Sequence, residues 1–138
     1  MRIALDTNVY VSVFVFQSKR LGQMLNFIGL NHQIVMCSYV LDELKEVIKE
    51  KFSAKLAALD IFLTSIPFEY FYSPPILPDP LDFEIRDRDD ASVLYSAILS
   101  GADILITGDK DFSDIAADRL ERPEIMTPAQ FMKLYMME

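Results

Sequence analysis

Short runs of consecutive apolar residues alternate along the chain with longer stretches in which apolar residues recur at helical spacing. The apolar runs predict strands at Ile3–Leu5, Ile34–Cys37, Ile104–Thr107 and Ile125–Met126, with a weaker fifth candidate at Phe68–Tyr72. Runs that are apolar throughout are typical of parallel strands that are buried on both faces. The pattern therefore predicts an α/β protein with a mostly parallel central sheet of about five strands.

The stretches between these strands carry apolar residues three and four positions apart, as on one face of a helix. Such stripes are Leu21–Ile28, Val40–Ile48, Phe52–Ile66 and Val93–Ile98. Gly101 stands where the last of these helices would end, and Thr127-Pro128 is a good cap and first position for a final helix. Val9–Phe16 is ambiguous, because its alternating valines favour a strand on propensity.

The composition is that of one ordinary domain, which we place over residues 1–138. Of these residues, 51% are hydrophobic and 25% are charged, which excludes a disordered tail or a low-complexity array. The single cysteine, Cys37, and the single histidine, His32, can form neither an internal disulfide nor a Cys/His zinc cluster, and we expect both to be structural. Any chemistry must therefore use carboxylates, hydroxyls or amides.

Charge and hydropathy narrow the range of partners. Acidic residues outnumber basic ones 21 to 13, which gives a net charge of -8. This charge opposes tight non-specific binding to nucleic acid, because phosphate affinity comes largely from lysine and arginine. No apolar run approaches the roughly 20 residues of a membrane span, so we expect a soluble, cytoplasmic protein that does not contact a membrane.

Several acids come directly after predicted strands. Asp6 follows the first strand, and Asp109 and Asp111 follow Ile104–Thr107 after a glycine. In parallel α/β proteins the loops at the carboxyl ends of the strands hold the functional site. Each acid alone also has a simpler interpretation, since Asp6 could cap the next helix and Gly108-Asp109 could be a turn.

The strongest single candidate is Asp90. It precedes Val93, Leu94 and Ala97 by three, four and seven positions, and therefore lies on the core-facing stripe of its helix. A buried carboxylate is costly unless it is paired, protonated or bound to a cation, so its placement indicates a function. The alternative is an inward helix cap or a buried pair with Arg86 or Arg88.

Glu43 is a further candidate on the predicted helix Val40–Ile48. At 100° per residue, Asp42 and Glu46 point toward solvent, whereas Glu43 flanks the buried stripe and lies close to the end of the preceding strand. The alternative is a solvated helix face whose acids pair with lysines of the same helix.

Convergence of these acids would create a cation site. The candidates are Asp6, Glu43, Asp90 and either Asp109 or Asp111. Two carboxylates 4 Å apart repel by about 4 kcal/mol at an effective dielectric of 20. A divalent cation removes that cost, and a shell of oxygens alone suits Mg²⁺ or Mn²⁺ rather than zinc. Such a site catalyses phosphodiester hydrolysis, with hydroxyl or amide donors supplied by Thr7, Asn8 and Thr107.

Five motifs follow one another along the chain: Leu5–Val9, Ser38 with Leu41–Leu44, Arg86–Asp90, Gly101–Phe112 and Thr127–Phe131. In this order they resemble the PIN domain, the fold of VapC-type ribonuclease toxins. The resemblance covers nearly the whole chain and implies a three-layer α/β/α fold in which Val9–Phe16 begins a helix. It also implies metal ligation by Asp6, Glu43, Asp90 and Asp109, while Asp111 matches a position that is acidic in many relatives.

The resemblance implies a Mg²⁺- or Mn²⁺-dependent endoribonuclease that is the toxin of a type II toxin-antitoxin pair. In the family a small antitoxin typically covers the acidic groove, and the toxin forms homodimers. Arg86 and Lys110 adjoin the acids and are weak candidates for contacts with the RNA. Tyr10 and Phe14 could stack on a base, although packing in the core is the commoner role of such aromatics.

Two other functions remain open. The first is a phosphatase resembling the haloacid dehalogenase group, with Asp6 as the nucleophile. That chemistry needs a second acid two residues later, where this chain has Asn8. The second is a PIN-like interaction module without catalytic activity, which would show no stabilisation by divalent cations.

Overall fold

The computed structural model describes residues 1–72, 88–108 and 123–136, with residues 88–90 described by their backbone only. The described residues contain a five-stranded sheet in the order β3-β2-β1-β4-β5, in which every pairing is parallel. The strands are β1 (Arg2–Leu5), β2 (Gln33–Cys37), β3 (Phe68–Phe71), β4 (Ile104–Ile106) and β5 (Glu124–Met126). All five predicted strands are confirmed, each within one residue at either end.

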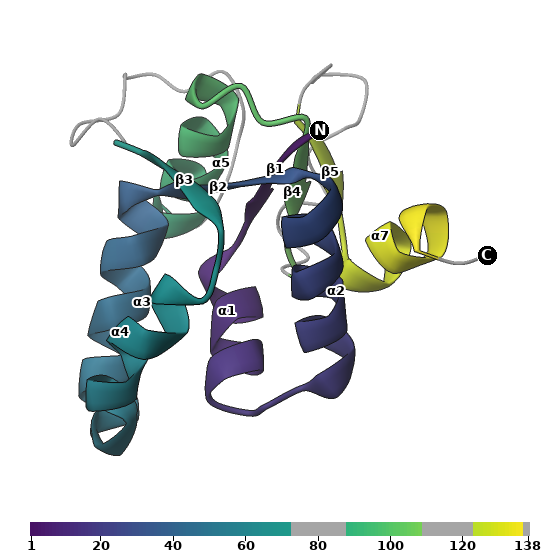
Figure 1. The fold of residues 1–138 in the computed structure, drawn as a ribbon. Coiled ribbons are helices and arrows are strands. Elements are labelled where there is room, and N and C mark those ends of the chain that lie inside the picture. The colour runs from purple at the N-terminus through teal and green to yellow at the C-terminus, as the bar shows by residue number, and fades with distance from the viewer. Residues whose placement is uncertain (73–87, 109–122, 137–138) are drawn as a thin grey trace.

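Six α-helices and one 3-10 turn connect the strands in the described part of the chain. They are α1 (Thr7–Phe14), α2 (Lys19–Asn31), α3 (Ser38–Lys51), η1 (Ser53–Lys55), α4 (Leu56–Thr64), α5 (Arg88–Leu99) and α7 (Pro128–Tyr135). The connections from β1 to β2 and from β2 to β3 run in one direction along the sheet, and the return to β4 runs in the other. Because parallel connections are right-handed, α5 covers the face opposite to α1–α4. Figure 1 shows α5 behind the sheet, which confirms the three-layer α/β/α architecture.

The middle of the sheet is the most deeply buried part of the molecule. Ile3, Ala4 and Leu5 of β1 and all three residues of β4 are at most 4% exposed. The continuous apolar runs therefore belong to strands with helices on both faces, as the pattern predicted. The edge strand β3 is more open, and Tyr70 is 51% exposed.

The strand that propensity favours at Val9–Phe16 does not form. Thr7–Phe14 is helix α1 instead. Asp6 caps this helix, and its side chain accepts a hydrogen bond from the Thr7 amide. Val9, Tyr10 and Val11 are all buried in the helical conformation. Strand propensities span only about 1 kcal/mol, which the burial of three large side chains exceeds. The helix implied by the family resemblance is confirmed.

The stripe Phe52–Ile66, which predicted a single helix, contains the 3-10 turn η1 followed by the shorter helix α4. Phe52 is the C-cap of α3, and after η1 the helix α4 extends only from Leu56 to Thr64. The ends of the later helices follow the predictions closely. Gly101 adopts a φ of 73° just after α5, and Thr127 forms a capping box with Gln130 at the start of α7.

The strand order reverses direction at β1, since β2 and β4 flank it on either side. In open α/β sheets the crevice at the carboxyl ends of the strands at such a point is where ligands bind. The described segments that follow the strands at this edge are Asp6–Asn8 after β1, Ser38 after β2, and Thr107-Gly108 after β4. None of the described helices is long and apolar enough to cross a bilayer.

Candidate active site

Asp6 is buried directly after the central strand, with 5% of its surface exposed. Its Oδ1 accepts a hydrogen bond from the Thr7 amide at 2.7 Å, and its Oδ2 accepts one from the Thr107 hydroxyl at 2.9 Å. The Asp6 amide donates to the Ile106 carbonyl at 2.9 Å. The carboxylate is therefore fixed between the start of α1 and the end of β4, so that it caps the helix and also lies at the predicted edge of the sheet.

Thr107 connects Asp6 to the far side of the sheet. It is 1% exposed, and its amide donates to the Met126 carbonyl of β5 at 2.9 Å. The backbone thereby holds the Thr107 hydroxyl in place while that hydroxyl donates to Asp6. A hydroxyl that is fixed in this way orients a carboxylate, as outer hydrogen-bond partners do at metal sites.

The first turn of α1 carries two polar side chains with opposite environments. Asn8 is exposed, whereas Thr7 is 2% exposed and its Oγ1 has no hydrogen-bond partner in the described structure. Asn8 is therefore accessible to a substrate or an ordered water, and Thr7 is not in contact with solvent.

Tyr10 is fully buried, and its hydroxyl also has no hydrogen-bond partner among the described residues. Burial, followed by the neighbouring Cys37, raises the pKa of the Tyr10 phenol far above its usual range, so that the phenol stays protonated. Base stacking by Tyr10 is excluded by this burial, and its role in packing is confirmed. Nothing in the sequence distinguished its hydroxyl, because a tyrosine among valines is typical of a core.

Glu43 lies in the second turn of α3, whose first residue is the buried Ser38. Glu43 is partly buried, whereas Asp42 and Glu46 on the same helix are exposed. The helix-face prediction is thus confirmed for these three acids. The helix that carries Glu43 contacts both α1, which Asp6 caps, and α5, which contains residue 90.

Of the remaining acids, Asp90 is described by its backbone only, and Asp109 and Asp111 lie outside the described residues. Residue 90 lies in the first turn of α5, and Val93, Leu94 and Ala97 of the same stripe are buried. The side chain of Asp90 lies outside the described structure, as do residues 109–111 and Arg86. Within the described ranges no group of three or more His, Cys, Asp or Glu side chains could hold a metal ion. Convergence of the four acids therefore remains a prediction.

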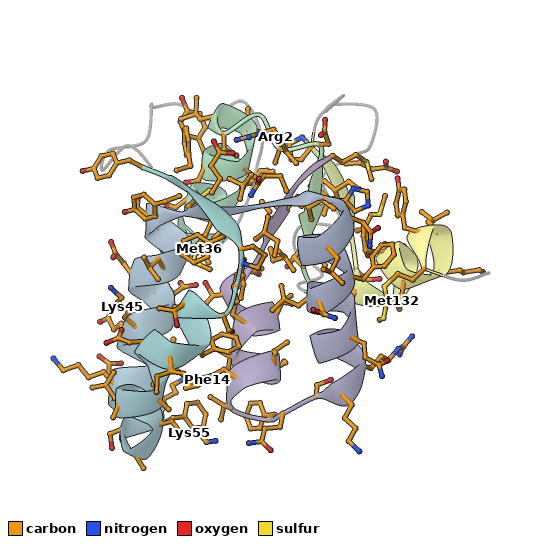
Figure 2. The ribbon with its side chains drawn as sticks, in the orientation of Figure 1. Arg2, Phe14, Met36, Lys45, Lys55 and Met132 are labelled. Carbon is orange, nitrogen blue, oxygen red and sulfur yellow. The ribbon has the colours of Figure 1, made fainter. Side chains whose placement is uncertain are left out.

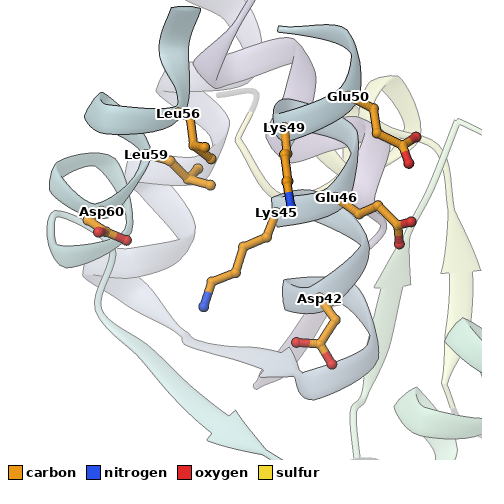
Figure 3. Close-up of a pocket in the computed structure, with 8 residues that line it drawn as sticks. All are labelled: Asp42, Lys45, Glu46, Lys49, Glu50, Leu56, Leu59 and Asp60. Carbon is orange, nitrogen blue, oxygen red and sulfur yellow. The ribbon is translucent and has the colours of Figure 1, made fainter. Parts of the chain in front are cut away.

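Two hollows in the described surface lie away from these acids. One is a charged groove between α3 and α4, which Figure 3 shows with Leu56, Leu59 and Asp60 on one side and Lys45 extending from α3 into the space between the two helices. The other is a largely apolar groove between α2 and the end of α4, lined in part by Leu25, Leu30 and Phe62. Neither groove contains Asp6, Glu43 or Thr107.

The topology and the position of Asp6 can now be compared with known proteins. The sequence profile described as "PIN domain" matches residues 2–111. The chain belongs to the PIN domain family. The match includes Asp6, Glu43, Asp90, Asp109 and Asp111 within its span, and it gives no support to the phosphatase alternative.

The fold of this PIN domain is similar to that of a solved structure. It matches a chain in the crystal structure of VapBC2 from Rickettsia felis bound to a DNA fragment from their promoter. The TM-score is 0.66 at 20% sequence identity, over 92% of this chain and 98% of the other. At this identity the likeness supports the fold. A comparison with curated protein sequences finds no match.

Proposed function

We propose that this PIN domain is a Mg²⁺- or Mn²⁺-dependent endoribonuclease whose active site is the carboxyl edge of the sheet. The observation that carries the proposal is the buried Asp6 carboxylate, held by Thr107 and the Thr7 amide at the end of the central strand. A carboxylate in this position is costly in an apolar core but suits a site that binds a cation. Its ligand partners would be Glu43, Asp90 and either Asp109 or Asp111.

The donor set fits a hard divalent cation. The candidate ligands offer carboxylate oxygens only, and each carboxylate oxygen has two acceptor positions, so the bonds to Asp6 are compatible with ligation. When bound, the cation polarises a phosphoryl oxygen and lowers the pKa of a bound water. The protein's own contribution is to hold Asp6 in one orientation, through the Thr107 hydroxyl and the first amide of α1.

Other residues would contact the RNA or the attacking water. We expect the Asn8 amide, which is exposed at the start of α1, to orient a water or a phosphate oxygen. Arg86 and Lys110 adjoin the acids in the sequence and would neutralise phosphate charge. The net charge of -8 leaves little non-specific attraction for RNA, so we expect weak binding that depends on the cation.

The biological role that we infer is that of a cytoplasmic toxin in a type II toxin-antitoxin pair. The support is membership of the PIN family together with structural similarity to VapBC2. A small antitoxin would inhibit the enzyme, and the acidic surface favours a basic segment on that partner. We expect the toxin to form a homodimer.

A cleavage assay tests this proposal. Purified protein should cut defined single-stranded RNAs in the presence of Mg²⁺ or Mn²⁺ and lose this activity in chelator. Asp90→Asn should abolish cleavage, while Asp89→Asn, one position away in the same helix, serves as the matched control. Cleavage that persists in Asp90→Asn, or that is absent from the parent with either cation, would exclude the proposed function and favour a silent interaction module.

A further inference from the structure

Two buried hydroxyls on α1, the helix that Asp6 caps, have no hydrogen-bond partner in the described structure. They are Thr7 Oγ1, on a residue that is 2% exposed, and the Tyr10 hydroxyl, on a residue that is 0% exposed. Buried polar side-chain atoms almost always have a partner, and an unpartnered one destabilises the fold. Two such atoms within one turn of the same helix indicate a common cause.

The helix geometry directs both hydroxyls toward the same region. Thr7 and Tyr10 are three residues apart on α1 and are therefore neighbours on one face. Long side chains on a helix lean toward its N-terminus, so the Tyr10 ring covers the turn that begins at Asp6. Cys37, the last residue of β2, is a neighbour of the phenol and adds to the rise in its pKa.

The chemistry of this region selects a small neutral ligand. Each hydroxyl can donate one hydrogen bond and accept others, so a single molecule that both donates and accepts satisfies the two together. Both residues are closed to solvent, and their neighbours on α1, Val9 and Val11, are buried as well. Buried water is the common ligand of such a pair, since it needs two to four polar partners.

We propose that Thr7 and Tyr10 bind one buried water behind Asp6, which makes Tyr10 a positioning residue for the Asp6 carboxylate. The water links the Thr7 and Tyr10 side chains across the first turn of α1. That turn contains the Thr7 amide, which donates to Asp6 Oδ1. Loss of the water would loosen the turn and with it the orientation of the carboxylate. The positioning role rests on the proposed function, whereas the water site does not.

Thermal unfolding of the metal-free protein tests the water site. Tyr10→Phe and Thr7→Val each remove one hydroxyl with little change in shape. If the two share a water, each variant lowers the Tm by about 3 °C, and the double variant loses little more than the larger single loss. Tyr70→Phe, at a half-exposed tyrosine, is the control and should leave the Tm unchanged. A Tm that rises or stays constant in Tyr10→Phe would overturn the proposal, because removing a hydroxyl without a partner stabilises the fold.

Calorimetric titration with Mn²⁺ tests the positioning role separately. Tyr10→Phe should weaken Mn²⁺ binding about tenfold, the effect expected when a supporting partner of a ligand is lost. An affinity within twofold of the parent would show that Tyr10 does not position Asp6. A parent protein that binds no Mn²⁺ contradicts the proposed function and the positioning role, while the Tm comparison still decides the water site.

Discussion

At the amino edge of the sheet the side chains of Arg2 and Asp103 have partners at the surface, whereas at the carboxyl edge Asp6 is buried and caps a helix that carries two hydroxyls without a partner in the described structure. Arg2 pairs with Glu69 of β3, and its Nη2 donates to the Ser100 carbonyl at 3.0 Å. The Arg2 amide donates to Asp103 Oδ2 at 2.7 Å. Figure 2 shows Arg2 at the end of the sheet far from α1.

The two edges thus use polar groups for different purposes. The amino edge fastens β1 to β3, to the end of α5 and to the start of β4, and its charges remain partly exposed. Such contacts stabilise the fold without creating reactivity. The carboxyl edge holds a buried carboxylate in one orientation, and a buried negative charge favours a cation. We therefore expect substitutions at the amino edge to change stability, and substitutions at the carboxyl edge to change activity.

The largest effect should come from matched aspartates at the two edges. Asp6→Asn retains the helix cap but removes the charge, so RNA cleavage with Mn²⁺ should fall at least about 100-fold, the upper end of the cost of losing a partner of a metal ligand. The cleavage rate of Asp103→Asn should stay within twofold of the parent rate. Initial cleavage rates on one fluorescent RNA measure both. Equal losses in the two variants would show that the edges do not differ in function.

A smaller effect is expected on α3, where two glutamates lie on different faces. Glu43→Gln removes a candidate ligand and should reduce the cleavage rate by roughly 10- to 100-fold. Glu46→Gln, at an exposed position on the same helix, should change the rate by less than twofold. The same cleavage assay distinguishes them. A Glu43→Gln variant as active as Glu46→Gln would remove Glu43 from the site.

Arg2→Met tests the structural role of the amino edge. The substitution keeps most of the apolar stem and removes the bonds to Ser100 and Glu69, so the free energy of unfolding should fall by about 1–2 kcal/mol. Urea denaturation measures this loss. Cleavage per folded molecule should stay within twofold of the parent, and a large loss of activity at unchanged stability would contradict the assignment.

The smallest effect concerns pH at the amino edge. Partial burial, followed by the positive N-terminus, lowers the pKa of His32 from its usual 6.5. The unfolded chain therefore binds a proton more readily than the folded protein, and stability declines as the pH falls below 6.5. The Tm should drop slightly less between pH 7.5 and 5.5 in His32→Gln than in the parent. An identical drop in both proteins would show that His32 does not contribute.

Most of the fold could be predicted from the sequence, because strands that are buried on both faces consist of apolar residues throughout. All three residues of β4 are buried, and Ile104-Leu105-Ile106 is apolar throughout. The failure at Val9–Phe16 has a physical cause. Local propensity favours a strand, but the Asp6 cap and the burial of Tyr10 decide for a helix, and the core that buries Tyr10 is formed by residues distant in the sequence.

The candidate site could be predicted only in part. The position of Asp6 after β1 and the orientation of Glu43 follow from strand ends and helix periodicity, and both are confirmed. The hydrogen bond from Thr107 to Asp6 joins residues 101 positions apart, so no local pattern could predict it. The absence of a partner for the Tyr10 hydroxyl, in the part of the chain described by the structure, depends on the packing around it and has no signal in the sequence.

The central claim is that the carboxyl edge binds a divalent cation through Asp6. It is tested most directly by the Tm of the parent and of Asp6→Asn at increasing Mn²⁺. At 100 times the Kd, binding to the folded state alone stabilises a protein by about 2.7 kcal/mol, which corresponds to a rise of several degrees. We predict this rise for the parent and none for Asp6→Asn. An equal rise in both proteins, or no rise in the parent, would contradict the claim.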